Sequence, residues 1–232
     1  MNRVMGNPTT TPIKLTEEKQ AINSLRHYGD ANIVPSDKNS FAFTLFDMED
    51  SKEAVAKAKT TDISGEIVIP YEVVRDGKVY RVIGIAQRGF QDCIGITNIR
   101  IPKAITLGGA CFMNTGITSC LVPDGVTDIP INTFYDCTNL VEVTLPKSIT
   151  SIKAGSFQNC VSLTDVYYDG TKKEWDKIAI SSNGNEYFKN ATIHYGYADV
   201  TKGYVDEKIG EIDNALLSII DIQNSLIGGA GE

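Results

Sequence analysis

The most regular feature of the sequence is an alternation of apolar and polar positions that recurs through residues 94–168. In residues 140–146, apolar and polar side chains alternate, which indicates a half-buried strand, and Pro146 ends it because proline has no N–H to donate. Residues 148–152 then supply two more aliphatic positions, and Phe157 follows. The two preceding periods carry apolar residues in the same slots, namely Ile99, Ile101, Ile105 and Phe112, and Cys120, Val122, Val126 and Phe134.

Four phenylalanines mark the period. Phe90, Phe112, Phe134 and Phe157 follow one another at intervals of 22, 22 and 23 residues. A fixed period of this size indicates a solenoid. Because a single coil cannot bury both of its faces, the coils must stack, and each phenylalanine is expected inside the stack. Burying one such ring contributes about 1.5–3 kcal/mol of transfer free energy.

The chain before these periods predicts strands as well. Residues 67–70 open the first coil, but their aliphatic-proline pair precedes the next one by 32 residues, and the extra length is residues 71–80. Asp76-Gly77 lies between two strand-like runs, so a protruding hairpin is expected there. Residues 41–46 read as a strand. Residues 54–59 have a helix-like composition, but their alternation and position favour a strand.

The repeated segments resemble a known family. The pattern of residues 140–146, followed by I-T-x-I at 149–152 and by Phe157 and Cys160, is similar to the BspA-type leucine-rich repeat. Residues 166–195 resemble the closing segment of such arrays, and the resemblance extends over roughly residues 41–197. It implies a mainly β fold, a leucine-rich-repeat solenoid of about four to five coils with a capping segment.

The predicted cap, residues 165–197, is rich in aromatic residues. Residues 172–174 are expected to form a short helix leading into Trp175, which serves either as cap core or as a ligand-stacking residue. Aromatic rings suit both sugar binding and core packing. The candidate ligand face therefore comprises Tyr168, Trp175 and Tyr187.

Both ends of the chain differ from the repeats. Residues 1–40 predict a polar arm and a short helix capped by Thr16. Residues 201–232 carry heptad spacing, and isoleucine at its d positions favours three or more strands. A single helix packed on the solenoid is the alternative. The predicted domains are residues 1–40, 41–200 and 201–232, and the predicted oligomerisation residues are Val205, Ile209, Ile212, Leu216, Ile219 and Leu226.

Composition excludes several classes of protein. The 232 residues have a net charge of −7, and lysine and arginine gather nowhere, so no nucleic-acid partner is expected. No run of 18 apolar residues predicts a membrane span, and residues 1–14 lack the apolar core of a secretory signal. With two histidines in the chain, a zinc site is not expected. The five cysteines are predicted to be free buried thiols, namely Cys93, Cys111, Cys120, Cys137 and Cys160.

No constellation of catalytic residues is found, and neither an enzyme nor a cofactor is predicted. The acidic run of Asp47, Glu49, Asp50 and Glu53 has the ligand chemistry for a divalent cation, but a solvated loop is the favoured interpretation. Asp165 and Asp169 are too unspecific in an acidic chain to indicate a glycosidase pair.

Residues 201–206, followed by heptads, also resemble the T-K-x-Y-V-D element of bacteriophage tail-fibre and related virion proteins. The resulting hypothesis is a non-enzymatic virion structural protein, a homotrimer that contacts other virion proteins and uses its solenoid as a spacer or to recognise a host-surface glycan or protein. Virions would be its location. The alternatives are a bacterial surface or secreted adhesin of the same repeat family and an intracellular protein-interaction module.

Overall fold

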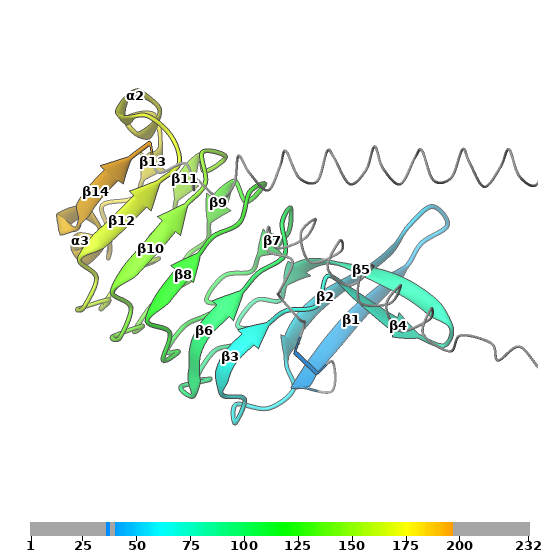
Figure 1. Cartoon of the computed structure of the whole chain (residues 1–232). Helices are drawn as coiled ribbons and strands as arrows, with labels where there is room; N and C mark the ends of the chain where they lie inside the picture. Colours follow the sequence, from blue (N-terminus) through cyan, green and yellow to red (C-terminus); the bar gives the residue numbers. More distant parts are fainter. Residues whose placement is uncertain (1–35, 38–39, 197–232) are drawn as a thin grey trace, which may run out of the picture. The chain divides into compact units, whose positions relative to one another are not determined.

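Parallel strands from successive coils lie side by side along the protein and form its longest layer (Figure 1). The computed structural model describes residues 36–37 and 40–196. Each strand is short because proline or a turn follows it, as at Pro102, Pro123 and Pro146. The strands of this layer are β3 (Gly65–Val68), β6 (Ile96–Arg100), β8 (Ser119–Leu121), β10 (Glu142–Leu145), β12 (Asp165–Tyr168) and β14 (Thr192–Tyr195).

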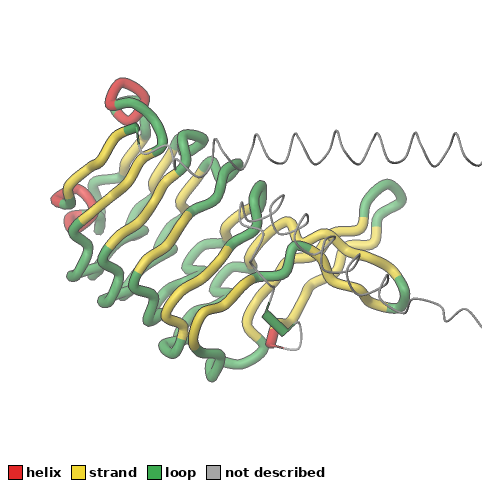
Figure 2. Tube along the Cα trace, viewed as in Figure 1, coloured by secondary structure: helices red, strands yellow, loops and turns green. Residues whose placement is uncertain are grey.

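A second ribbon of two-residue strands runs along another side of the coils (Figure 2). β9 (Asp128–Ile129), β11 (Ser151–Ile152) and β13 (Ala179–Ile180) pair in parallel, and β7 (Thr106–Leu107) pairs with β5. The apolar residue of each pair points inward, as Ile129 and Ile152 show by their burial. The predicted solenoid is therefore confirmed, with about five turns.

The N-terminal end is a mixed sheet. β1 (Phe41–Asp47) pairs antiparallel with β2 (Lys52–Ala58), which pairs parallel with β5 (Lys78–Ile85). β4 (Glu72–Arg75) and β5 form the predicted hairpin, and both turn residues have positive φ, 50° at Asp76 and 73° at Gly77. The strand predictions for residues 41–46 and 54–59 are confirmed as β1 and β2.

The phenylalanine column passes through the centre of the coils. Ring centroids lie 5.9 Å apart between Phe90 and Phe112, 5.6 Å between Phe112 and Phe134, and 5.2 Å between Phe134 and Phe157. All four rings are fully buried. The column continues beyond the repeats, because Phe41 contacts Phe90 at 6.2 Å and Phe188 stacks on Phe157 at 4.5 Å.

Backbone hydrogen bonds connect the coils beside this column. The N–H of Phe112 donates to the carbonyl of Thr133 at 3.0 Å, and that of Phe134 donates to Ser156 at 2.8 Å, one coil onward in each case. Two cysteine thiols donate hydrogen bonds to the preceding coil. Cys137 Sγ donates to the Phe112 carbonyl at 3.0 Å, and Cys160 Sγ donates to the Phe134 carbonyl at 3.1 Å. The five cysteines are free and buried, as predicted.

Two short helices close the array. α2 (Lys172–Trp175) begins at Thr171 with a capping box, in which Glu174 and Thr171 exchange hydrogen bonds, so the predicted short helix is confirmed. α3 (Glu186–Asn190) places Phe188 on the column. The helices lie at the same end of the array as β13 and β14, the last strands of the two sheets (Figure 1).

Several predictions fall outside the described residues. The short N-terminal helix and most of the arm lie in residues 1–35. All six predicted oligomerisation residues, Val205 to Leu226, lie in residues 197–232. The coiled-coil helix, the trimer and the division at residues 40 and 200 therefore stay predictions, whereas residues 35–198 form one unit.

Candidate interaction surface

The outward side chains of β8, β10, β12 and β14 form two rows, which we call the outer face. Strand alternation sends Cys120, Val143 and Val166 into the core, so their neighbours point to solvent. The strand register places one row at Ser119, Glu142, Asp165 and Thr192. The same register gives the second row, Leu121, Thr144, Tyr167 and His194.

An aromatic pair occupies the C-terminal end of the second row. The rings of Tyr167 and His194 stack with centroids 4.5 Å apart and an interplanar angle of 15°. His194 Nε2 lies 2.7 Å from Asp165 Oδ1, so the carboxylate holds the imidazole against the tyrosine. The hydrogen bond with His194, together with one from Thr164, lowers the pKa of Asp165 below its usual range. These contacts fix the orientation of both rings.

Apolar and acidic groups fill the middle of the outer face. Leu121 is 46% exposed, and Val141, just before β10, is 44% exposed. Glu142 lies beside Asp165 on the neighbouring strand, and it has no ion-pair partner within residues 36–37 and 40–196. The four strands contain no lysine or arginine. The outer face thus combines rings, aliphatic groups and, at Glu142, a carboxylate without an ion-pair partner among the described residues.

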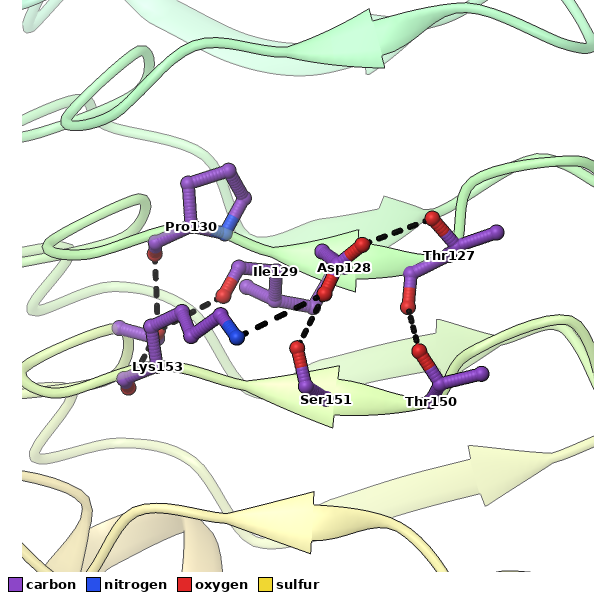
Figure 3. A network of polar contacts seen from close by, with 8 residues as sticks. Thr127, Asp128, Ile129, Pro130, Thr150, Ser151 and Lys153 are labelled. Carbon is purple, nitrogen blue, oxygen red and sulfur yellow. Dashed lines mark hydrogen bonds and ion pairs between the residues drawn. The ribbon is translucent and has the colours of Figure 1, made fainter.

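The second ribbon differs because its polar groups bind one another (Figure 3). Asp128 accepts a 2.7 Å hydrogen bond from Thr127 Oγ1 and a further one from Ser151 Oγ, and Lys153 Nζ lies 3.8 Å away. The bond from Ser151, followed by that from Thr127, lowers the pKa of Asp128. Thr150 Oγ1 donates to the Thr127 carbonyl at 3.0 Å. These contacts connect adjacent coils, so the ribbon satisfies its own polar groups.

The predicted ligand face is split by the structure. Tyr168 is 1% exposed and packs edge-on against Trp175, with centroids 5.3 Å apart. Trp175 also stacks on Phe188 at 5.9 Å, so both residues pack in the core of the cap. Burial raises the pKa of Tyr168. Tyr187, at 39%, is the exposed member of the three. On the sheet, Tyr167 and His194 lie in the outward row, and Tyr195 at the end of β14 is 39% exposed.

The acidic loop is an ion-pair site. Asp47 contacts Lys52 at 3.1 Å and also binds Lys78. The hydrogen bond from Lys78, followed by that from Lys52, lowers the pKa of Asp47 to about 2. Within the described residues, no group of three or more metal-ligating side chains comes together. Asp165, considered above with Asp169, binds His194 instead.

The repeats match a known protein family. Residues 79–190 match the model of the BspA type leucine rich repeat region in six copies. These residues are a BspA-type leucine-rich repeat region. The match extends over the phenylalanine column from Phe90 to Phe188, which confirms the resemblance for the repeats. It stops before residues 201–232, so it gives no support to the tail-fibre resemblance of that segment.

This chain is similar to several solved leucine-rich repeat structures. A Treponema pallidum leucine-rich repeat protein aligns with a TM-score of 0.51 and 18% identity, covering 70% of this chain and 82% of that one. A Bacteroides ovatus leucine-rich repeat protein has a TM-score of 0.49 and 20% identity over 71% of this chain, and the match spans 37% of the Bacteroides protein. A Faecalibacterium prausnitzii leucine-rich cell surface protein gives 0.42 and 17%, over 66% of this chain and 45% of that one.

Two further findings complete the comparison. No curated protein matches the chain significantly. Among the helices that the structure describes, none is long and apolar enough to span a membrane.

Proposed function

We propose that this chain is a non-enzymatic recognition module that binds its partner through the outer face. The observation that carries the proposal is the contrast between the two β surfaces. On the second ribbon, Asp128 is bound by Thr127, Ser151 and Lys153 from its own chain. On the outer face, Glu142 is exposed and has no ion-pair partner among the described residues, and Leu121 is 46% exposed. A surface that leaves such groups open is suited to a second molecule.

The solenoid gives this surface rigidity. Outward side chains can change from coil to coil without disturbing the column formed by residues such as Phe134, because strand alternation separates the two sets. Stacked coils also present an extended array of side chains at strand spacing. Both properties favour recognition over catalysis, which agrees with the family of residues 79–190.

Binding of the purified, fluorescently labelled chain to intact bacterial cells would test the proposal. Flow cytometry would compare the wild-type chain with Leu121→Lys on the outer face. Val161→Lys is the matched control, because Val161 is 54% exposed and lies in a turn, outside the four strands of the outer face. We expect Leu121→Lys to reduce the cell-bound signal at least fivefold and Val161→Lys to leave it unchanged. Equal signals from both variants would refute the outer face as the binding surface.

Two settings would use such a module. The first is the bacterial cell surface, the setting in which the Faecalibacterium prausnitzii protein is described. The second is a bacteriophage virion, favoured by the heptad spacing of residues 205–226, which would make the protein a homotrimer. Mass spectrometry of purified virions, alongside surface biotinylation of the bacteria, separates them. Recovery in virions supports the second setting, and labelling of the cell surface supports the first.

A further inference from the structure

The charge on the outer face is exceptional among the strands of this protein. Acidic residues elsewhere in strands lie beside a base: Arg81 is 3.8 Å from Glu53, and Arg100 is 3.2 Å from Glu66. Glu142 has no such neighbour within the described residues. Its strand neighbour Asp165 is likewise a carboxylate, which His194 and Thr164 bind, and like charges on adjacent strands repel one another. A cation from another molecule would relieve that repulsion.

The surroundings of these carboxylates suit the stem of a basic side chain. Leu121 and Val141 expose aliphatic surface near Glu142, and Tyr167 adds an aromatic ring whose position is fixed by His194. Lysine and arginine side chains bury their methylene groups on apolar surface while the charged end reaches a carboxylate. A guanidinium or ammonium group also binds favourably to a tyrosine ring. Apolar contact and charge thus occur at the same place.

We propose that the outer face binds a lysine- or arginine-bearing segment of a partner protein, with Glu142 receiving the cationic group and Leu121 and Tyr167 contacting its stem. The inference rests on the proposed function, because it specifies the partner of the same surface. Charge complementarity selects this occupant: the four strands of the outer face contain no lysine or arginine, their one histidine, His194, binds Asp165, and Glu142 has no ion-pair partner among the described residues. An acidic segment would be repelled there.

The experiment uses fluorescence anisotropy of labelled hexa-arginine and hexa-glutamate peptides with the full chain at 50 and 150 mM salt. The decisive pair of variants is Glu142→Lys and Glu49→Lys. Both change the net charge equally, and Glu49 is an exposed residue next to β1, outside the outer face. We expect Glu142→Lys to weaken hexa-arginine binding at least tenfold and Glu49→Lys to weaken it less than twofold. Tyr167→Ala should weaken it about threefold or more.

Equal weakening by the two lysine variants would overturn the proposal, since binding would then depend only on net charge. Binding of hexa-glutamate as tight as that of hexa-arginine would also overturn it. Glu142→Gln removes the negative charge without adding a positive one, so it serves as a second variant in case Glu142→Lys misfolds. It should still weaken hexa-arginine binding, and an unchanged affinity for hexa-arginine would contradict the proposal. If hexa-arginine fails to bind but Leu121→Lys still abolishes cell binding, the outer face is a recognition surface for another chemistry, and only the cationic partner is refuted.

Discussion

Asn185 Oδ1 accepts a hydrogen bond from the backbone N–H of Phe157 at 2.9 Å. In the coils before it, the N–H of Phe112 or Phe134 donates to a backbone carbonyl of the next coil. At Phe157, the side chain of Asn185 takes the place of that carbonyl. Its Nδ2 donates to the carbonyls of Lys153 and Ser181 at 2.9 and 3.0 Å. One buried side chain thus ends the hydrogen-bond ladder.

Asn185→Ala should therefore destabilise the protein strongly. It leaves the buried Phe157 N–H without its partner, and an unsatisfied buried group costs about 1–3 kcal/mol, whereas the Lys153 carbonyl keeps its hydrogen bond from Ser156 Oγ. We expect the free energy of unfolding to fall by about 1–3 kcal/mol in urea denaturation. Asn183→Ala is the matched control, because that side chain is exposed. A loss no larger than the control's would show that Asn185 does not cap the array.

Phe134→Ala tests the column itself. Phe134 stacks between Phe112 and Phe157, and its ring is fully buried. Removing it leaves a cavity, for which we expect a loss of about 3–5 kcal/mol by chemical denaturation. Phe46→Ala, at a ring that is 44% exposed, should cost about 1 kcal/mol or less. Comparable losses at both positions would argue against a shared column.

The cysteines should be unreactive in the folded chain. Burial raises the pKa of Cys93 to about 11, of Cys120 to about 12 and of Cys137 to about 11. Because the thiolate is the reactive form, we expect no thiol to react with a disulfide reagent at pH 8 within minutes. All five thiols should react once the chain is unfolded in guanidinium. Rapid labelling of the native chain would contradict the burial of these side chains.

Asp47 should titrate at unusually low pH. The bonds from Lys78 and Lys52 favour its carboxylate, which lowers the pKa from 3.8 to about 2 in the folded chain. Because the folded pKa is the lower one, the stabilisation is complete above the unfolded value and disappears as the pH falls from about 4 to 2. Carboxyl ¹³C NMR would measure the titration. Lys78→Ala should raise the pKa, while Lys57→Ala, an exposed residue of β2, should leave it unchanged.

The repeats made much of the fold predictable. The spacing of Phe90, Phe112, Phe134 and Phe157 predicts the column because four equivalent coils present the same pattern, and each coil supports the reading of the next. Asp76-Gly77 predicts the hairpin because positive φ is cheap for these residue types. Residues 54–58 lie in a strand despite a helix-like composition, because pairing with β1 and β5 outweighs local propensity.

The residues that complete the two ends of the array could not be predicted, because they lie outside the repeat. Asn185, Phe188 and Phe41 complete the ladder and the column, but they lie outside the period, and nothing in the local sequence distinguishes them from ordinary loop or strand residues. Tyr168 was placed with the candidate ligand face, whereas the register of β12 turns it inward and leaves Tyr167 outside. A one-residue difference along a strand reverses the direction of a side chain.

The sequence by itself determined that this chain stacks coils around buried phenylalanines, since an apolar pattern repeated at a constant interval has one stable solution, a common core. Only the tertiary structure decided that Asp165 meets His194, 29 residues away, and that Glu142 faces solvent with no ion-pair partner in the part of the chain that the structure describes. Such encounters depend on which strands become neighbours and on their register. Strand pairing brings residues far apart in the chain into contact, and the local pattern of polar residues carries no record of it.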